Sequence, residues 1–112
     1  MSARWHITHQ DGAVTLSRHL PARFDVAAST QFPPLRPVRL AHQIRQDLWR
    51  ALSALRGFSP VVRLEPTEAG WAVTAGGRVM GRIGPHVEGT IAALLSDPAK
   101  RTRWVRHARV TT

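Results

Sequence analysis

The chain contains no cysteine, which excludes a disulfide framework, a cysteine-ligated metal or iron–sulfur site, and a thiol nucleophile. The longest unbroken aliphatic run, Ile91 to Leu95, is far too short to cross a bilayer. The N-terminal residues lack the basic flank and apolar stretch of a secretory signal. We therefore expect a single domain over residues 1–112, cytoplasmic and without a membrane segment, with a hydrophobic core of its own. No motif implies a cofactor.

Acidic residues are scarce: seven Asp and Glu stand against 16 Lys and Arg, giving a net charge of +9. Among the basic residues only Lys100 is a lysine, and Ala, Arg, Gly and Pro are abundant. This composition is typical of GC-rich coding. The excess charge therefore has two open explanations, a coding bias or selection for binding a polyanion.

Two segments have the pattern of β-hairpins. The first, Arg4 to Arg18, turns at Asp11-Gly12, a pair that suits a type I′ turn. Pairing outward from this turn places Trp5 opposite Arg18 as a cation–π pair, and it separates a buried face from a wet one. The second hairpin, Trp71 to Ile83, is expected to turn at Gly76-Gly77. A further strand, Val61 to Glu65, precedes it.

Three segments have helical spacing. The longest begins at Val38 and ends before Gly57, the next runs from Gly84-Pro85 to about Ser96, and the last covers about 98–109 after the N-cap Asp97. The expected buried positions of the first are Ala41, Ile44, Leu48, Leu52 and Leu55, broadened by Trp49 and Ala51; those of the second are Val87, Ile91, Leu94 and Leu95; those of the third are Trp104, Val105 and Ala108.

These elements predict an α+β fold. Its sheet is mostly antiparallel and consists of two hairpins plus an extra strand, packed by one long amphipathic helix and two C-terminal helices. A short strand over Phe24 to Ala28 and a Pro-rich extended connector over 29–37 are expected before the long helix.

The last helix holds the densest basic cluster, and no acid follows Asp97. Its members are Lys100, Arg101, Arg103, Arg106, His107 and Arg109. One interpretation is a phosphate-binding ridge for nucleic acid or for an acidic protein surface. The other is a solvated helix end whose cations favour the helix dipole. On the long helix, Arg39 and Arg50 occupy a polar face that could join the same polyanion-binding surface.

The six histidines show no metal-binding spacing, since His6 and His9 point to opposite faces of a strand and no His-x-x-x-His pair exists. The scattered acids and serines match no nucleophilic or phosphate-cradle motif. A site assembled in space from His and acidic groups stays open, so a small enzyme is the third hypothesis for this chain.

Phe32 and Leu35 are apolar residues in a connector that should be exposed, and they are protein-contact candidates unless they fold back onto the core. The first functional hypothesis is a non-catalytic binding module that docks a polyanion, in particular nucleic acid, through the C-terminal helix. The alternative is an accessory subunit of a larger protein complex that makes no nucleic-acid contact. We recognise no protein family in these patterns.

Overall fold

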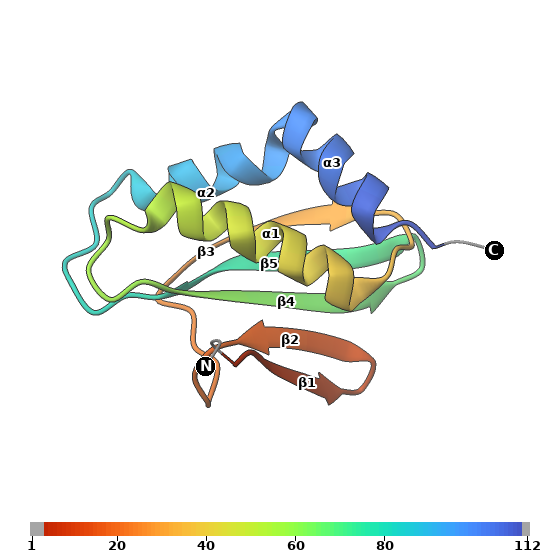
Figure 1. Ribbon diagram of the computed structural model, residues 1–112, viewed down its shortest axis with the longest axis horizontal. Coiled ribbons are helices and arrows are strands. Elements are labelled where there is room, and N and C mark those ends of the chain that lie inside the picture. Colours follow the sequence, from red (N-terminus) through yellow and green to blue (C-terminus); the bar gives the residue numbers. More distant parts are fainter. Residues whose placement is uncertain (1–3, 111–112) are drawn as a thin grey trace.

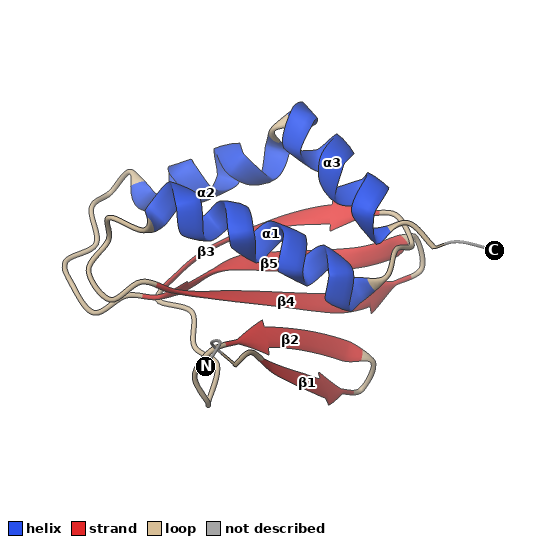
Figure 2. Cartoon of the chain, viewed as in Figure 1, coloured by secondary structure: helices blue, strands red, loops and turns tan. Residues whose placement is uncertain are grey.

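The computed structural model describes residues 4–110, so residues 1–3 and 111–112 of the expected domain lie outside the described residues. The elements are β1 (His6–Gln10), β2 (Ala13–Ser17), β3 (Val26–Phe32), α1 (Pro37–Leu52), β4 (Ser59–Thr67), β5 (Gly70–Arg78), α2 (Val87–Ser96) and α3 (Pro98–Ala108). The strands form one antiparallel sheet, and the helices pack on one of its faces (Figure 1, Figure 2). The predicted α+β class is confirmed, with its two hairpins, extra strand and three helices. Among the described residues, no helix is both long and apolar enough to cross a membrane.

The first hairpin forms at the predicted turn. Asp11 and Gly12 have φ values of +53° and +82°, as a type I′ turn requires. The register also follows the prediction, with His9 opposite Val14. The expected division into one buried and one wet face is wrong, because β2 is buried along its whole length while most of β1 is exposed. The cause is position: β2 lies between β1 and β4, whereas β1 is the edge strand.

The hairpin predicted over Trp71 to Ile83 does not form. The second hairpin of the sheet joins β4 to β5, and its turn lies at residues 68–69 instead of at Gly76-Gly77. β5 runs straight through both glycines. A Cβ on Gly76 would collide with the carbonyl oxygen of Val26, and a Cβ on Gly77 would collide with that of Ser59. The glycine pair therefore serves the close approach of neighbouring strands, which sequence alone does not distinguish from a turn.

β3 lies at the sheet edge opposite β1. In the strand order β1-β2-β4-β5-β3, two strands separate β2 from β3. The chain therefore crosses from β2 to the far edge of the sheet, where β3 pairs with β5. The strand is longer than predicted, since Val26–Phe32 includes the first four residues of the expected connector 29–37. The connector proper is short, because α1 already begins at Pro37.

The core lies between the sheet and the helices. α1 packs mainly on β4 and β2, and α2 packs on β3. Leu16, Val62 and Ala75 occupy matching positions on adjacent strands and face this core. The opposite face of the sheet carries a polar row, in which Arg63 donates to Thr15 at 3.3 Å. The two faces are thus clearly different.

The three helices are confirmed close to their predicted limits. All the predicted apolar positions of α2 are buried, and so are Ala41, Ile44, Leu48 and Leu52 of α1, whereas Ala51 is exposed. Asp97 caps α3 by accepting a hydrogen bond from the Lys100 backbone N–H at 3.0 Å. Trp49, expected to broaden the buried stripe of α1, is instead 49% exposed. Asp47, on the polar side of the sequence pattern, is 5% exposed. Both exceptions belong to the sites described next.

Candidate functional site

α3 divides the predicted basic cluster into engaged and exposed cations. Arg101 is engaged, because its guanidinium lies over the Phe32 ring, 4.0 Å from the ring centroid. It donates to Thr30 Oγ1 and the Leu95 carbonyl at 2.9 Å and to the Gln31 carbonyl at 2.6 Å. Burial lowers the pKa of Arg101 from its ordinary value. This residue attaches α3 to the end of β3, so it does not offer its charge to a partner.

Arg103 is also engaged, at the contact between α3 and α1. Its guanidinium pairs with the buried carboxylate of Asp47. The same carboxylate accepts a hydrogen bond from the indole N–H of Trp104 at 2.6 Å, and Arg50 lies 3.5 Å away from its second oxygen. Two predicted binding residues from different helices, Arg103 and Arg50, are therefore brought together around one acid that the sequence analysis did not single out.

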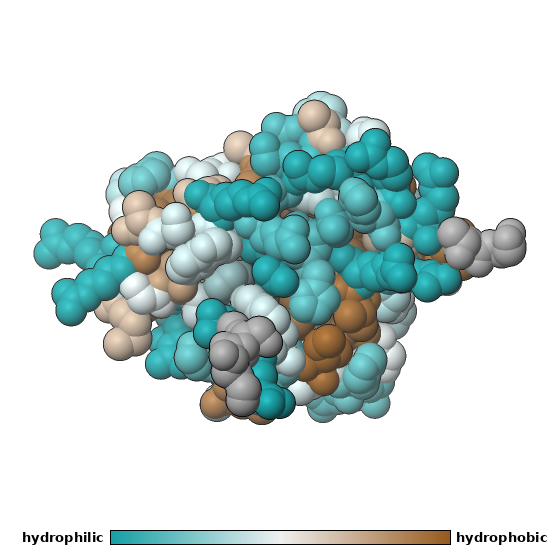
Figure 3. Space-filling model, viewed as in Figure 1, coloured by the Kyte–Doolittle hydropathy of each residue, from teal (hydrophilic) through white to brown (hydrophobic). Residues whose placement is uncertain are grey.

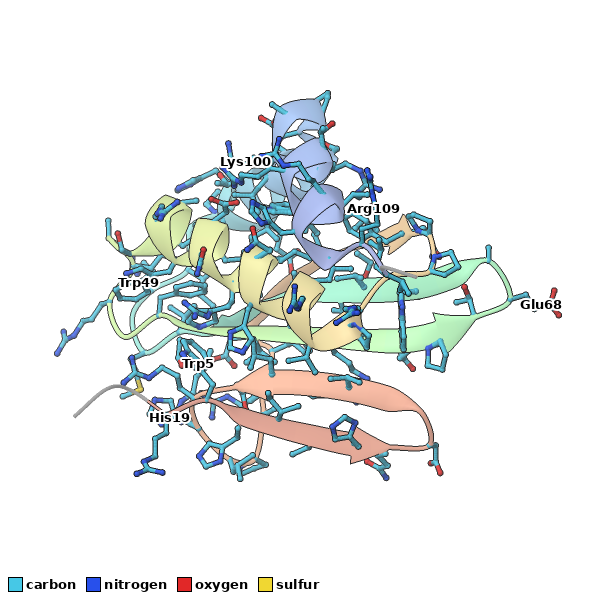
Figure 4. All side chains as sticks on the ribbon, turned by 45° about the vertical axis from the view of Figure 1, so that its right-hand side comes forward. Trp5, His19, Trp49, Glu68, Lys100 and Arg109 are labelled. Atoms are coloured by element: carbon cyan, nitrogen blue, oxygen red, sulfur yellow. The ribbon has the colours of Figure 1, made fainter. Side chains whose placement is uncertain are left out.

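The remaining predicted cations lie on the outer surface of the helical layer. Arg39, Arg106, His107 and Arg109 are exposed, and no ion pair of theirs is found among residues 4–110. Lys100 is partly engaged, 3.7 Å from the capping Asp97. Figure 4 labels Lys100, which lies in the first turn of α3, and Arg109, which directly follows the helix. Hydrophilic residues cover much of α3 in the space-filling view (Figure 3).

Most of the scarce carboxylates are engaged inside the fold. Asp47 and Asp97 serve α1 and α3, while Asp25, Glu65 and Glu88 each bond an arginine or a backbone N–H elsewhere. Asp11 and Glu68 have no such contact among the described residues, and both lie at hairpin turns. Figure 4 shows Glu68 at the tip of the second hairpin. Exposed arginines therefore dominate the charge of the helical surface.

Phe32 and Leu35 do not form a protein-contact surface. They are 4% and 6% exposed, and both belong to the hydrophobic core. The Phe32 ring packs against Trp104 of α3, and the Leu35 carbonyl accepts a hydrogen bond from the Trp71 indole at 3.0 Å. The connector is thus folded back onto the core, which removes the basis for the predicted contact.

The sequence analysis missed a pocket of about 400 Å³ at the opposite end of α1 from Arg39. Chain segments from the first hairpin, from α1 and from the start of β4 line it, and no carboxylate is among its lining residues. Figure 4 shows three of these side chains, Trp5, His19 and Trp49, at this end of the molecule. The residues that determine its chemistry are Trp5, Arg18, His19, Arg45, Trp49 and Phe58.

Two arginines share one indole in this pocket. The guanidinium carbon of Arg45 lies 4.6 Å from the centroid of Trp5, and that of Arg18 lies 5.7 Å from it. The Nε of Arg45 donates to Nδ1 of His42 at 3.3 Å. Burial, followed by the nearby charge of Arg18, lowers the pKa of Arg45. The pocket therefore holds two neighbouring positive charges and aromatic surface, and residues 4–110 contribute no carboxylate to its lining, an arrangement suited to an anion.

The sequence held a partial signal for this pocket. The pairing of Trp5 with Arg18 was predicted from the hairpin register, and the cation–π contact confirms it. Arg45 and Trp49 lie on α1, and the predicted stripe of this helix assigned Trp49 to the core. No local pattern therefore indicated that these residues of α1 lie beside Trp5 and Arg18 of the first hairpin. Residues 4–110 contain no group of three or more His, Asp or Glu side chains that could hold a metal ion.

Comparison with protein-family models, with curated proteins and with solved structures finds no match to this chain.

Proposed function

We propose that this chain is a non-catalytic binding module that docks a nucleic acid on the surface shared by α1 and α3. We define this α1–α3 surface by Arg39, Arg50, Lys100, Arg103, Arg106, His107 and Arg109. The observation that carries the proposal is the bridge at Asp47, because it holds Arg103 and Arg50 beside one another and joins the cations of both helices into one surface. Arg101, part of the predicted cluster, is left out because three hydrogen bonds and the Phe32 ring occupy its guanidinium, whereas the Arg103 side chain stays 40% exposed beside Asp47.

The arrangement of α1 fits a phosphate backbone. Arg39, Gln43, Gln46 and Arg50 follow steps of four, three and four residues and so lie on one side of the helix. The row extends over about 16 Å at 1.5 Å per residue. Arginines separated in this way, with amides between them, can contact successive phosphates while the amides reach sugars or bases.

Binding of a labelled single- or double-stranded oligonucleotide across a salt series tests this proposal. The triple variant Arg39→Gln/Arg106→Gln/Arg109→Gln removes exposed cations from the α1–α3 surface. We expect weaker binding and a shallower salt dependence, by about 0.9 in the log–log slope for each lost phosphate contact on duplex DNA. Two outcomes would overturn the proposal: no binding at low salt, or an equal loss in the charge-matched control Arg4→Gln/Arg56→Gln/Arg82→Gln, whose residues lie elsewhere.

A second candidate function, an accessory subunit of a protein complex, is supported by the edge strand β1. This strand is mostly exposed, and in the described part of the chain β2 is its one neighbour in the sheet. Such an edge can accept a strand from another chain. Co-purification at native expression tests this function, and a strictly monomeric protein without a stable partner would argue against it.

A further inference from the structure

We propose that the pocket between the first hairpin and the end of α1 binds a nucleotide, with its phosphate on Arg18 and Arg45 and its base on Trp49. This site is separate from the α1–α3 surface, and the inference does not depend on the function proposed for that surface. The two sources of such a ligand are a free mononucleotide and the phosphorylated end of a single strand, which share the same chemistry.

The anion end of the pocket is built from the two arginines. Arg45 is partly buried, and its Nε donates a hydrogen bond to His42. This bond favours one orientation of the guanidinium and leaves its two terminal nitrogens for a ligand. Arg18 and Arg45 both lie over Trp5, and no carboxylate lines the pocket. Two guanidinium charges match a phosphate monoester, which carries about −1.5 to −2 at neutral pH, better than they match a single carboxylate.

The flat end of the pocket is Trp49. This large apolar residue is 49% exposed, although it lies near the end of a helix that packs on the core. Its ring is nearly parallel to that of Phe58, with a centroid separation of 6.5 Å and an angle of 13° between the planes, and this contact favours one orientation of the indole. An exposed, supported indole beside a basic group is the usual platform for a nucleobase, since every base presents a flat π-face.

The volume also suits this class of ligand. At about 400 Å³ the pocket falls within the range of about 300–1,000 Å³ that small-molecule sites occupy. Its lining combines Arg18 from the first hairpin with Arg45 and Trp49, one turn apart on α1, so a ligand with a charged group and a planar group can contact all three. A nucleoside monophosphate has this form.

Calorimetric or NMR titration with AMP, adenosine and ribose 5-phosphate tests the proposal. We expect AMP to bind at least about tenfold more tightly than either fragment, because each fragment forms only part of the contacts. Arg18→Gln and Arg45→Gln should each weaken AMP and ribose 5-phosphate about tenfold and leave adenosine unchanged. Trp49→Leu should weaken AMP and adenosine about tenfold and leave ribose 5-phosphate unchanged. Trp49 and Arg18 are not core residues, so these variants should keep their thermal stability.

The matched control is Arg82→Gln, which removes one exposed charge outside the pocket. Absence of AMP binding, equal affinity for AMP and adenosine, or an equal loss in Arg82→Gln would each overturn the proposal. A 5′-phosphorylated oligonucleotide that binds better than its 5′-hydroxyl form would assign the pocket to a strand end, and equal binding of the two forms alongside AMP binding would assign it to a free nucleotide. The variant Arg39→Gln/Arg106→Gln/Arg109→Gln should keep its AMP affinity, which separates this test from that of the α1–α3 surface.

Discussion

The two basic regions of this molecule handle their arginines in opposite ways. On the α1–α3 surface, Arg103 is held by the buried Asp47, and the first turn of α3 is held by Asp97. In the pocket, Arg18 and Arg45 lie together on Trp5 with no carboxylate beside them. A basic cluster that is dense in sequence thus contains arginines that hold the fold together, whereas two arginines 27 residues apart converge without a counter-charge.

The two regions illustrate two roles that an arginine can have, one in stabilising the fold and one in binding an anion. A guanidinium that pairs with a buried acid is part of the packing, and its loss should appear as lost stability. A guanidinium close to another positive charge, as Arg45 is to Arg18, contributes little to the fold and is most favourable with a bound anion. Stability and binding measurements on variants of both regions therefore test the comparison directly.

The largest effect is expected from Asp47→Ala. This change removes the hydrogen-bond acceptor of the buried Trp104 N–H and the ion-pair partner of Arg103. The indole N–H is then buried without an acceptor, and the guanidinium loses its counter-charge. We expect the free energy of unfolding to fall by about 3 kcal/mol, measured by urea denaturation. The matched change Arg50→Gln should cost less than about 0.5 kcal/mol, because its side chain is 72% exposed and 3.5 Å from the same carboxylate. Equal effects of the two changes would contradict the special role given to Asp47.

A smaller effect is expected from Arg101→Met. The methionine keeps an apolar stem over Phe32 but loses the hydrogen bonds to Thr30, Gln31 and Leu95. We expect a loss of about 1–2 kcal/mol in the free energy of unfolding. Arg106→Met, an exposed residue on the same helix, should change it by less than about 0.5 kcal/mol. If both variants are equally stable, Arg101 is a surface cation like the others, and the division of the cluster is wrong.

Local patterns in the sequence predicted most of the fold. The Asp11-Gly12 turn and the stripes of α1 and α2 are decided by neighbouring residues, and the structure confirms them. The turn of the second hairpin was misplaced, because Gly76-Gly77 is compatible with a turn and with a strand that its neighbours approach closely. That choice depends on β3, which lies about 50 residues earlier in the chain.

The candidate sites were less predictable, for the same physical reason. The basic residues of α3 were found as a cluster, but the partner of Arg103 was not, since Asp47 lies 56 residues away on another helix. Trp49 was assigned to the core from its spacing, although it lies beside the buried stripe of Leu48 and Leu52, at the pocket, and is 49% exposed. Which arginine meets which acid or ring is decided by tertiary packing, and a single sequence carries no direct record of it.

The pocket arginines should have little effect on stability, in contrast to Asp47 and Arg101. Arg18→Gln loses a cation–π contact with Trp5 and relieves the repulsion between Arg18 and Arg45, and these two effects have opposite signs. We expect the free energy of unfolding to change by less than about 0.5 kcal/mol without ligand. A loss of about 2 kcal/mol or more in urea denaturation would show that Arg18 is a structural residue, and the contrast between the two regions would then fail.

The smallest expected effect is a difference in how the stability contributed by each region depends on pH. Burial, together with the charge of Arg45, lowers the pKa of His42 below its ordinary 6.5, so the folded state resists protonation more than the unfolded chain does. The stabilisation from neutral His42 is therefore complete above that value and is lost as the pH falls below it. On the α3 side the hydrogen bond from the Lys100 N–H lowers the pKa of Asp97 below 3.8, so its contribution persists until the pH falls below that value. Between about pH 7.5 and about pH 5.5, the free energy of unfolding should therefore fall further in the natural protein than in His42→Gln. Identical falls in the two proteins would mean that the environment of His42 beneath the pocket does not discriminate between its protonation states.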